Sequence, residues 1–218
     1  MTVDDWHRVA ADDTGADPFP DPSCARTWRR RTDGRSSKLG VTATDLVAAA
    51  ASAERPMRAL LTLLDHVGGY REDPLRKKAA LLGVILRQRP ERFLPPADAA
   101  AGGTDGDDAP PIVDYHVQRS ALRTGMVDVG DPALRSQLVG RRVLDPADEW
   151  AVRRATFDAV ARLSELSGRD MGTVDWFLFQ MRHRCPEATV PDCAACPADP
   201  ACAHRTELFQ PVIRTTAY

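Results

Sequence analysis

The 218-residue chain lacks several features that would place it in a common class of protein. It has no apolar run near the roughly 18 residues that a bilayer-spanning helix needs. Its amino terminus, MTVDDWHRVAADD, has no basic region followed by an apolar stretch, so it does not resemble a secretory signal. We therefore expect a cytoplasmic monomer with no membrane partner.

A large positive charge is also missing, because the net charge is −2. The chain therefore does not have the charge profile of a strongly basic nucleic-acid-binding protein. Basic residues are nevertheless concentrated in two stretches, 26–38 and 71–92, whereas acidic residues collect at 12–21 and 98–108. This distribution allows a local phosphate-binding face. It fits equally well a charged surface that meets only solvent.

The alternating apolar pattern of β-strands is absent, and no internal repeat is visible. Apolar residues recur instead at helical spacing, and Asp-Pro pairs mark helix starts. The sequence therefore predicts an all-α fold. The expected helices run from Thr44 to about Ala53, from Pro56 to His66, from Asp73-Pro74 to Gln88, from Asp114 to Thr124, from Asp131-Pro132 onward, from Asp145-Pro146 to Gly168 and from Thr173 to Arg184.

Composition divides the chain into three predicted regions. Residues 1–41 form a lead-in with a basic segment that we expect to pack on the cysteine-rich end, residues 42–168 a helical core, and residues 169–218 a terminal helix with a cysteine-rich loop. A Gly/Pro/Asp-rich loop is expected at 95–111, which is long for a compact domain.

Only five cysteines occur, and four of them fall within eighteen residues in the spacing C-x7-C-x2-C-x5-C. Soft thiolates packed into a proline-rich loop favour zinc or an iron–sulfur cluster. Structural zinc usually needs two C-x2-C pairs, and only one is present. Disulfides are the third alternative. The outlying Cys24 is interpreted as a buried small apolar residue. The predicted metal ligands are Cys185, Cys193, Cys196 and Cys202.

Two motifs resemble the helix-hairpin-helix DNA glycosylase superfamily, over residues 42–205. The first is the segment 111–127, and the second, further along the chain, is Asp175-Trp176-Phe177-Leu178-Phe179-Gln180 followed by Arg182 and Cys185, which resembles the helix that leads into the family's cluster loop. The cysteine spacing is similar to the loop that holds a 4Fe–4S cluster in endonuclease III-like members. The segment 111–127 resembles the family's catalytic segment, in which an Asp stands at the start of a helix. Asp114 matches that Asp, and the residues in register with the pattern are His116, Val117, Arg119, Arg123 and Gly125.

This resemblance implies a two-lobed helix-hairpin-helix glycosylase-like fold with a C-terminal 4Fe–4S loop. It also implies an N-glycosylase that removes a modified or damaged base from DNA, with Asp114 as its essential carboxylate. A carboxylate can stabilise the oxocarbenium character that develops on the sugar, or activate a water. Asp is also a preferred helix cap, and the two roles are compatible.

The chain departs from the family before Asp114. The usual glycine-rich hairpin is replaced by Leu94-Pro95-Pro96 and a low-complexity loop, and no lysine lies between Lys78 and Asp114. The classical lysine-dependent lyase activity is therefore not expected. Candidate substrate contacts are Trp28, Tyr115, Lys77 and Lys78, although solvent-exposed lysines are the more ordinary interpretation. Tyr70 and Trp176 are further candidates for stacking on a base, although an aromatic on a helix usually packs in the core.

Two other functions stay open. The motif Asp114-Tyr115-His116-Val117, with Tyr after the Asp, also resembles that of the queuosine-salvage nucleotide glycosidases, which act on a free modified nucleotide. The second alternative is a non-catalytic iron–sulfur module that binds nucleic acid.

The other polar residues of the segment 111–127 have structural roles in this interpretation. Arg119 and Arg123 are expected to pair with acidic groups, and His116 to form structural hydrogen bonds.

Overall fold

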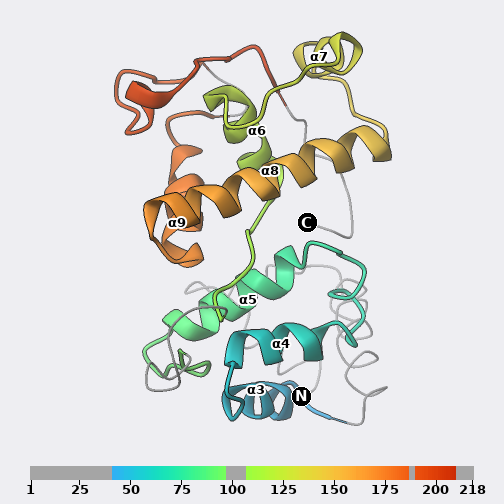
Figure 1. The fold of residues 1–218 in the computed structure, drawn as a ribbon, viewed down its shortest axis with the longest axis vertical. Coiled ribbons are helices and arrows are strands. Elements are labelled where there is room, and N and C mark those ends of the chain that lie inside the picture. Colours follow the sequence, from blue (N-terminus) through green and yellow to red (C-terminus); the bar gives the residue numbers. More distant parts are fainter. Residues whose placement is uncertain (1–40, 97–106, 187–189, 210–218) are drawn as a thin grey trace, which may run out of the picture. The chain divides into compact units, whose positions relative to one another are not determined.

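The structure is a computed structural model that describes residues 41–96, 107–186 and 190–209. The chain forms two compact units, 1–48 and 49–218, of which the first is described only over 41–48. Every regular element in the described ranges is helical (Figure 1), which confirms the predicted all-α class. None of these helices is both long enough and apolar enough to cross a bilayer. Trp28, Cys24 and the basic stretch 26–38 lie outside the described residues.

Most of the predicted helices are present, and two of the Asp-Pro pairs begin helices as expected. Asp131 and Asp145 cap their helices by accepting hydrogen bonds from backbone N–H groups of the first turn. The elements are α3 (Ala43–Ala51), α4 (Pro56–Leu64), α5 (Lys77–Gln88), α6 (Tyr115–Thr124), α7 (Pro132–Val139), α8 (Pro146–Ser167), α9 (Met171–Met181) and the short 3-10 helix η2 (Asp199–Ala201).

The boundaries of α3 and α9 differ from the predicted ones. Thr42, rather than Thr44, caps α3, because its hydroxyl accepts from the N–H of Asp45 while the Asp45 carboxylate accepts from the N–H of Thr42. This reciprocal pair is a capping box. Helix α9 begins at Met171, before the predicted Thr173, because Asp170 is its cap and accepts from the N–H of Thr173 at 3.0 Å.

Helix α5 starts three residues later than the Asp73-Pro74 pair predicts. Asp73 does accept hydrogen bonds from the N–H groups of Leu75 and Lys77, at 3.0 and 2.7 Å. Arg76, however, adopts a left-handed conformation (φ 56°, ψ 28°), so the regular helix begins only at Lys77. The side chain of Asp73 is also held by Arg153 of α8, in a buried ion pair of 2.6 Å.

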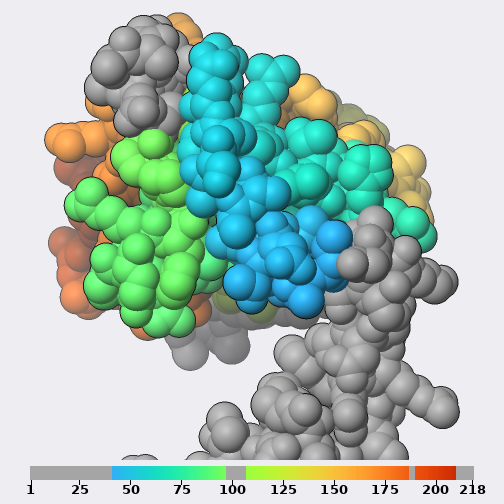
Figure 2. Space-filling view, turned by 90° about the horizontal axis from the view of Figure 1, so that it is seen from below, coloured from blue at the N-terminus to red at the C-terminus, as the bar shows by residue number. Residues whose placement is uncertain are grey.

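The apolar core consists of two clusters. The first joins α4, α5 and α9 through residues such as Met57, Ala80 and Leu178, and the second joins α7 to the chain near Leu208. Helices α6 and α8 contribute to both clusters. Helix α8 can do so because its 22 residues extend about 33 Å at 1.5 Å per residue. Within the first cluster α4 packs on α5, and Figure 2 shows the cyan of α4 beside the green end of α5 at the surface.

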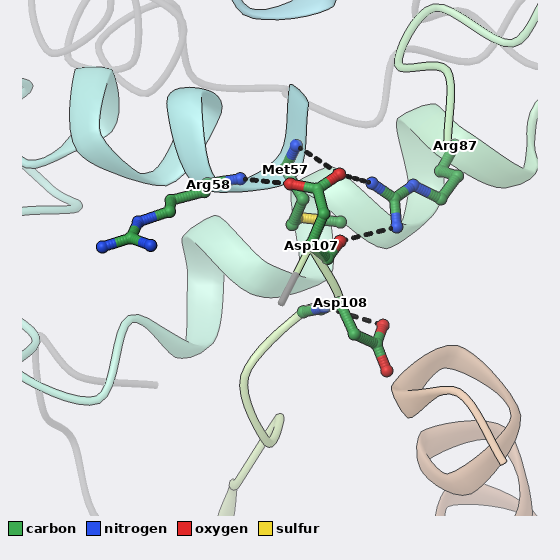
Figure 3. Close-up of polar contacts among 6 residues, drawn as sticks. Met57, Arg58, Arg87, Asp107 and Asp108 are labelled. Carbon is green, nitrogen blue, oxygen red and sulfur yellow. Dashed lines mark hydrogen bonds and ion pairs between the residues drawn. The ribbon is translucent and has the colours of Figure 1, made fainter. Parts of the chain in front are cut away.

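The segment before α6 is fixed by buried hydrogen bonds, although its first part falls in the predicted loop. The Asp107 carboxylate accepts from the N–H groups of Met57 and Arg58 and from the guanidinium of Arg87 (Figure 3). The next residue, Asp108, accepts from the N–H of Met171 at 2.7 Å. The chain that leads to Asp114 is therefore tied to α4, α5 and α9.

Candidate active site and metal centre

Asp114 lies at the N-terminus of α6 as its capping residue. Its Oδ1 atom accepts hydrogen bonds from the N–H groups of His116 and Val117, at 2.9 and 3.0 Å. Its Oδ2 atom accepts no hydrogen bond from the part of the chain that the structure describes. The side chain is half-buried. One oxygen therefore fixes the carboxylate, and the other remains available to a ligand.

A second carboxylate, Asp175 of α9, lies within electrostatic range of Asp114. Burial and the neighbouring charge of Asp114 raise the pKa of Asp175 to about 6, while the charge of Lys77 acts to lower it. These three side chains come from the starts of α5 and α6 and from α9, which packs against α6. The result is a pair of carboxylates beside an ammonium group, and one member of the pair can hold a proton near neutral pH.

The structure places the other predicted substrate contacts near this group or outside the described residues. Lys77 lies in range of Asp175, and both Lys77 and Lys78 are half-buried, so the expectation of solvent-exposed lysines was wrong. Tyr115 is half-buried, and its ring centroid is 4.2 Å from that of His116. His116 also forms a hydrogen bond with Arg119 through Nδ1 at 2.9 Å, the kind of contact expected of it. Trp28 is not among the described residues.

Sequence reasoning did not identify Asp175 as a site residue. It belongs to the helix that the sequence predicts before the cysteines, but no motif marks an Asp at this position as functional. The available signal was its place on α9 between the buried residues Val174 and Leu178, where a carboxylate is only partly solvated.

The exposed side of α9 carries a row of stacked side chains that follows Asp175 directly. Trp176 is 63% exposed, and its ring stacks on that of Phe179 with centroids 6.2 Å apart. The guanidinium of Arg182 lies 3.7 Å from the centre of the Phe179 ring. We call Trp176, Phe179 and Arg182 the aromatic row. Tyr70, by contrast, packs against the first core cluster, as an ordinary core aromatic does.

The four clustered cysteines line one small cavity near the C-terminal end of α6. None of them forms a disulfide with another. The pKa of the Cys193 thiol is raised by burial and by the charges of its neighbours, Cys202, Asp199, Cys185 and Cys196. This effect agrees with the convergence of the four side chains on one cavity, and a bound cation would reverse it. The loop can therefore hold a metal.

Two of these sulfur atoms accept hydrogen bonds from N–H groups. Arg123 donates to Cys185 at 3.2 Å, and the backbone of His204 donates to Cys202 at 3.3 Å. Donors of this kind orient thiolate ligands and tune the metal that they bind. Arg123 also donates to the carbonyls of Pro186 and Leu208, so the expectation that it pairs with an acidic group was wrong.

The loop also continues the hydrogen bonding of α6. Its N–H groups at Ala203 and Arg205 donate to the carbonyls of Thr124 and Arg123, at 3.0 and 2.9 Å. Gly125 permits this close approach, because its φ is 82° and a Cβ atom there would lie 2.8 Å from the Cβ of Ala203. The glycine of the sequence motif is thus required by the contact between α6 and the loop.

A second set of possible ligands shares this loop. One ligand atom each of Cys193, Asp199 and His204 lies within 4.8 Å of the others. His204 and Asp199 also bond each other at 2.8 Å. Sequence analysis did not predict Asp199 or His204 as ligands, because the spacing was read from the cysteines alone and only the fold of the loop brings these two side chains to Cys193.

Comparisons of the chain with protein-family models, with curated proteins and with solved structures found no match.

Proposed function

We propose that the protein is a monofunctional N-glycosylase that hydrolyses the bond between a sugar and a modified or damaged base in DNA. The observation that carries this proposal is the half-buried Asp114, held by Oδ1 at the start of α6 with Oδ2 available. The motif resemblance and this geometry support the same residue as the essential carboxylate. We also infer the two-lobed helix-hairpin-helix glycosylase-like arrangement, acting as a cytoplasmic monomer.

The chemistry follows from where charge develops in the reaction. As the N-glycosidic bond lengthens, the sugar gains oxocarbenium character, and a fixed carboxylate stabilises that charge. The hydrogen bonds from His116 and Val117 hold Asp114 in place before the substrate arrives, so little reorganisation is needed during the reaction. In duplex DNA the base would have to be extruded into the site.

The aromatic row supports a nucleic-acid substrate. Exposed aromatic rings stack on bases of any sequence, and a neighbouring arginine adds attraction for phosphate and for the ring face. Trp176 lies on the same helix as Asp175, and its exposed ring is accessible to a base. A free modified nucleotide remains the alternative substrate.

For the cofactor we propose a 4Fe–4S cluster held by the four cysteines. Such a cluster would supply a structural cross-link for a loop that contributes few residues to the core, and its four cysteine ligands leave no open metal position for hydrolysis. The bonds from Arg123 and His204 to ligand sulfurs fit such a centre.

A pair of variants separates this cluster from the mixed Cys/Asp/His site. Iron and acid-labile sulfide are measured per chain, with zinc as the competing metal. Cys202→Ser should lose the metal and His204→Ala should keep it, because His204 bonds Cys202 through its backbone. Loss of the metal in His204→Ala alone, with zinc present, would instead support the mixed site.

The function is tested by offering the anaerobically purified protein a panel of modified-base oligonucleotides and free modified nucleotides. Released base is detected by mass spectrometry. Asp114→Asn is the critical variant, because Asn is also a good cap and leaves α6 intact. Asp158→Asn on the exposed face of α8 is the matched control.

We expect release from oligonucleotides, lost in Asp114→Asn and kept in Asp158→Asn. Release from free nucleotides alone would move the substrate to the salvage class. Equal release by the wild type and Asp114→Asn would exclude Asp114 as the essential carboxylate, and no release from the whole panel would favour the non-catalytic nucleic-acid-binding module.

A further inference from the structure

Resting on the proposed function, we propose that Asp175 is the general acid that protonates the departing base while Asp114 stabilises the sugar cation. Helices α6 and α9 pack against each other, and the residues that flank the two carboxyls, Val113 with Val117 and Val174 with Leu178, belong to one buried cluster. Asp175 is thereby close enough to Asp114 and Lys77 for their charges to act on it. A modified base is a poor leaving group when it departs as an anion, and protonation at nitrogen removes that difficulty.

The environments of the two carboxyls assign their roles. The Oδ1 atom of Asp114 accepts two backbone hydrogen bonds at the start of α6, so this carboxyl is already used as a fixed hydrogen-bond acceptor. No hydrogen bond from the described residues reaches the carboxyl of Asp175, and the charge of Asp114 opposes its ionisation. Two neighbouring carboxyls in such different environments divide into a base and an acid.

The charged groups that act on Asp175 in the described part of the chain are Asp114 from α6 and Lys77 from α5. Lys77 limits the effect of Asp114, and the net result of burial and these two charges is a pKa of about 6. An acid with this pKa still holds its proton in an appreciable fraction of molecules near neutral pH, and it transfers that proton readily.

The reaction balances with one water molecule. The proton of Asp175 passes to the base nitrogen as the bond from this nitrogen to the sugar breaks. Water forms the new carbon–oxygen bond at the sugar, and its proton passes to Asp114. Transfer of that proton from Asp114 to Asp175, directly or through solvent, restores the starting state.

The first measurement is the titration of Asp175 itself, which does not depend on turnover. In protein labelled with ¹³C at the aspartate carboxyls, the resonance lost in Asp175→Asn should titrate near pH 6. In Asp114→Asn it should titrate at lower pH, because the neighbouring negative charge is gone. Titration near the ordinary value of about 3.9 in the wild type would overturn the acid role whatever the activity.

The second measurement is single-turnover excision over pH. Wild-type activity should fall as pH rises through about 6, and Asp175→Asn should lose roughly 10²–10⁴-fold in rate together with that pH dependence. The loss should shrink on a substrate whose base is acidic enough to depart without protonation. If Asp175 only positioned other groups, its replacement would lower the excision rate equally for the substrate with a poor leaving group and for the substrate with an acidic one.

The outcomes distinguish this inference from the proposed function. An Asp175→Asn variant as fast as the wild type, or one equally impaired on both leaving groups, would overturn the acid role and leave the glycosylase standing. A wild type that excises no base would overturn both. Asp158→Asn, with the same chemical change on exposed α8, should match the wild type throughout.

Discussion

The guanidinium of Arg123, in the last turn of α6, donates a hydrogen bond to the sulfur of Cys185 over 3.2 Å. Helix α6 begins at the other end with Asp114 as its cap and is 10 residues long, or about 15 Å. The candidate active site and the candidate metal centre therefore occupy opposite ends of one helix. A change that displaces α6 is therefore expected to alter both the position of Asp114 and the hydrogen bond from Arg123 to Cys185.

Arg123→Lys should weaken the attachment of the cysteine loop. The buried guanidinium donates to the sulfur of Cys185 and to the carbonyls of Pro186 and Leu208, and a lysine amine cannot reach all three in this geometry. We expect a loss of about 2–4 kcal/mol in the free energy of unfolding and a lower metal content. Urea unfolding and metal analysis measure the two effects.

Arg154→Lys, on the exposed face of α8, is the control and should change stability by less than about 0.5 kcal/mol. If Arg123→Lys were as stable and as metal-replete as this control, the three hydrogen bonds would contribute little to the loop.

Gly125→Ala and Gly168→Ala form a matched pair that isolates the contact between α6 and the loop. Both glycines end a helix with positive φ, so Ala costs about 1–2 kcal/mol at either site. Only at Gly125 would the new Cβ meet another atom, the Cβ of Ala203 at 2.8 Å. We therefore expect Gly125→Ala to be the more destabilising by at least about 1 kcal/mol and to lose metal. The measurement is thermal unfolding of the two variants. An equal fall in melting temperature would show that the loop moves away from the new Cβ at little cost.

Local signals predicted much of this fold because the relevant contacts are local. Asp131 and Asp145 bond N–H groups two or three residues ahead, so an Asp-Pro pair is sufficient to predict the helix start. Asp73 carries the same signal, yet α5 begins at Lys77. Asp73 is also held by Arg153, eighty residues away, and no local pattern reports such a partner.

The residues of the candidate sites likewise fall into those that local sequence patterns predicted and those that only the fold brings together. The spacing of the cysteines predicted the group that the folded loop brings together, because a short loop leaves its ligands few other arrangements. Asp175 lies 61 positions after Asp114, and only the packing of α9 on α6 places it nearby. The contribution of His204 and Asp199 to a possible metal site likewise required the folded loop.

Asp107→Ala should be among the most destabilising single changes at a carboxylate. Its side chain is 3% exposed, and it accepts hydrogen bonds from two N–H groups of α4 and from Arg87. Removal leaves the N-terminus of α4 uncapped and the Arg87 guanidinium without its carboxylate partner, at a cost of about 3–5 kcal/mol. The neighbouring Asp108→Ala loses the hydrogen bond from the N–H of Met171 at the start of α9, while Asp170 still caps that helix, and should cost only about 1 kcal/mol. Chemical unfolding of the two variants should therefore differ clearly, and similar values would contradict the bridging role of Asp107.

Lys77→Met should move the titration of Asp175 to higher pH. The positive charge of Lys77 favours ionised Asp175, so its removal raises the pKa further above 6. In the ¹³C titration the midpoint shifts upward, and in the excision assay the fall in activity occurs at higher pH. Lys78→Met tests the specificity of the effect, because Lys78 is not among the charges that act on Asp175. An unchanged midpoint in Lys77→Met would place Lys77 too far from Asp175 to influence it.

Asp175→Asn should stabilise the folded protein at neutral pH, even as it removes the proposed acid. The pKa of Asp175 is about 6 when folded and about 3.9 when unfolded, so the unfolded state loses its proton first as pH rises. The wild type is thus penalised increasingly between about pH 4 and pH 6, and the penalty stays constant above that range. The shift corresponds to about 3 kcal/mol, which partial solvent exposure reduces to about 1–2 kcal/mol.

Denaturant unfolding at two pH values measures this effect. At pH 4 the free energy of unfolding of Asp175→Asn should be close to that of the wild type, and at pH 7.5 the variant should be the more stable of the two. A gain that was equal at both pH values would arise from packing, and a loss at pH 7.5 would mean that ionised Asp175 is stabilised by Lys77 more than it is penalised by burial and by Asp114.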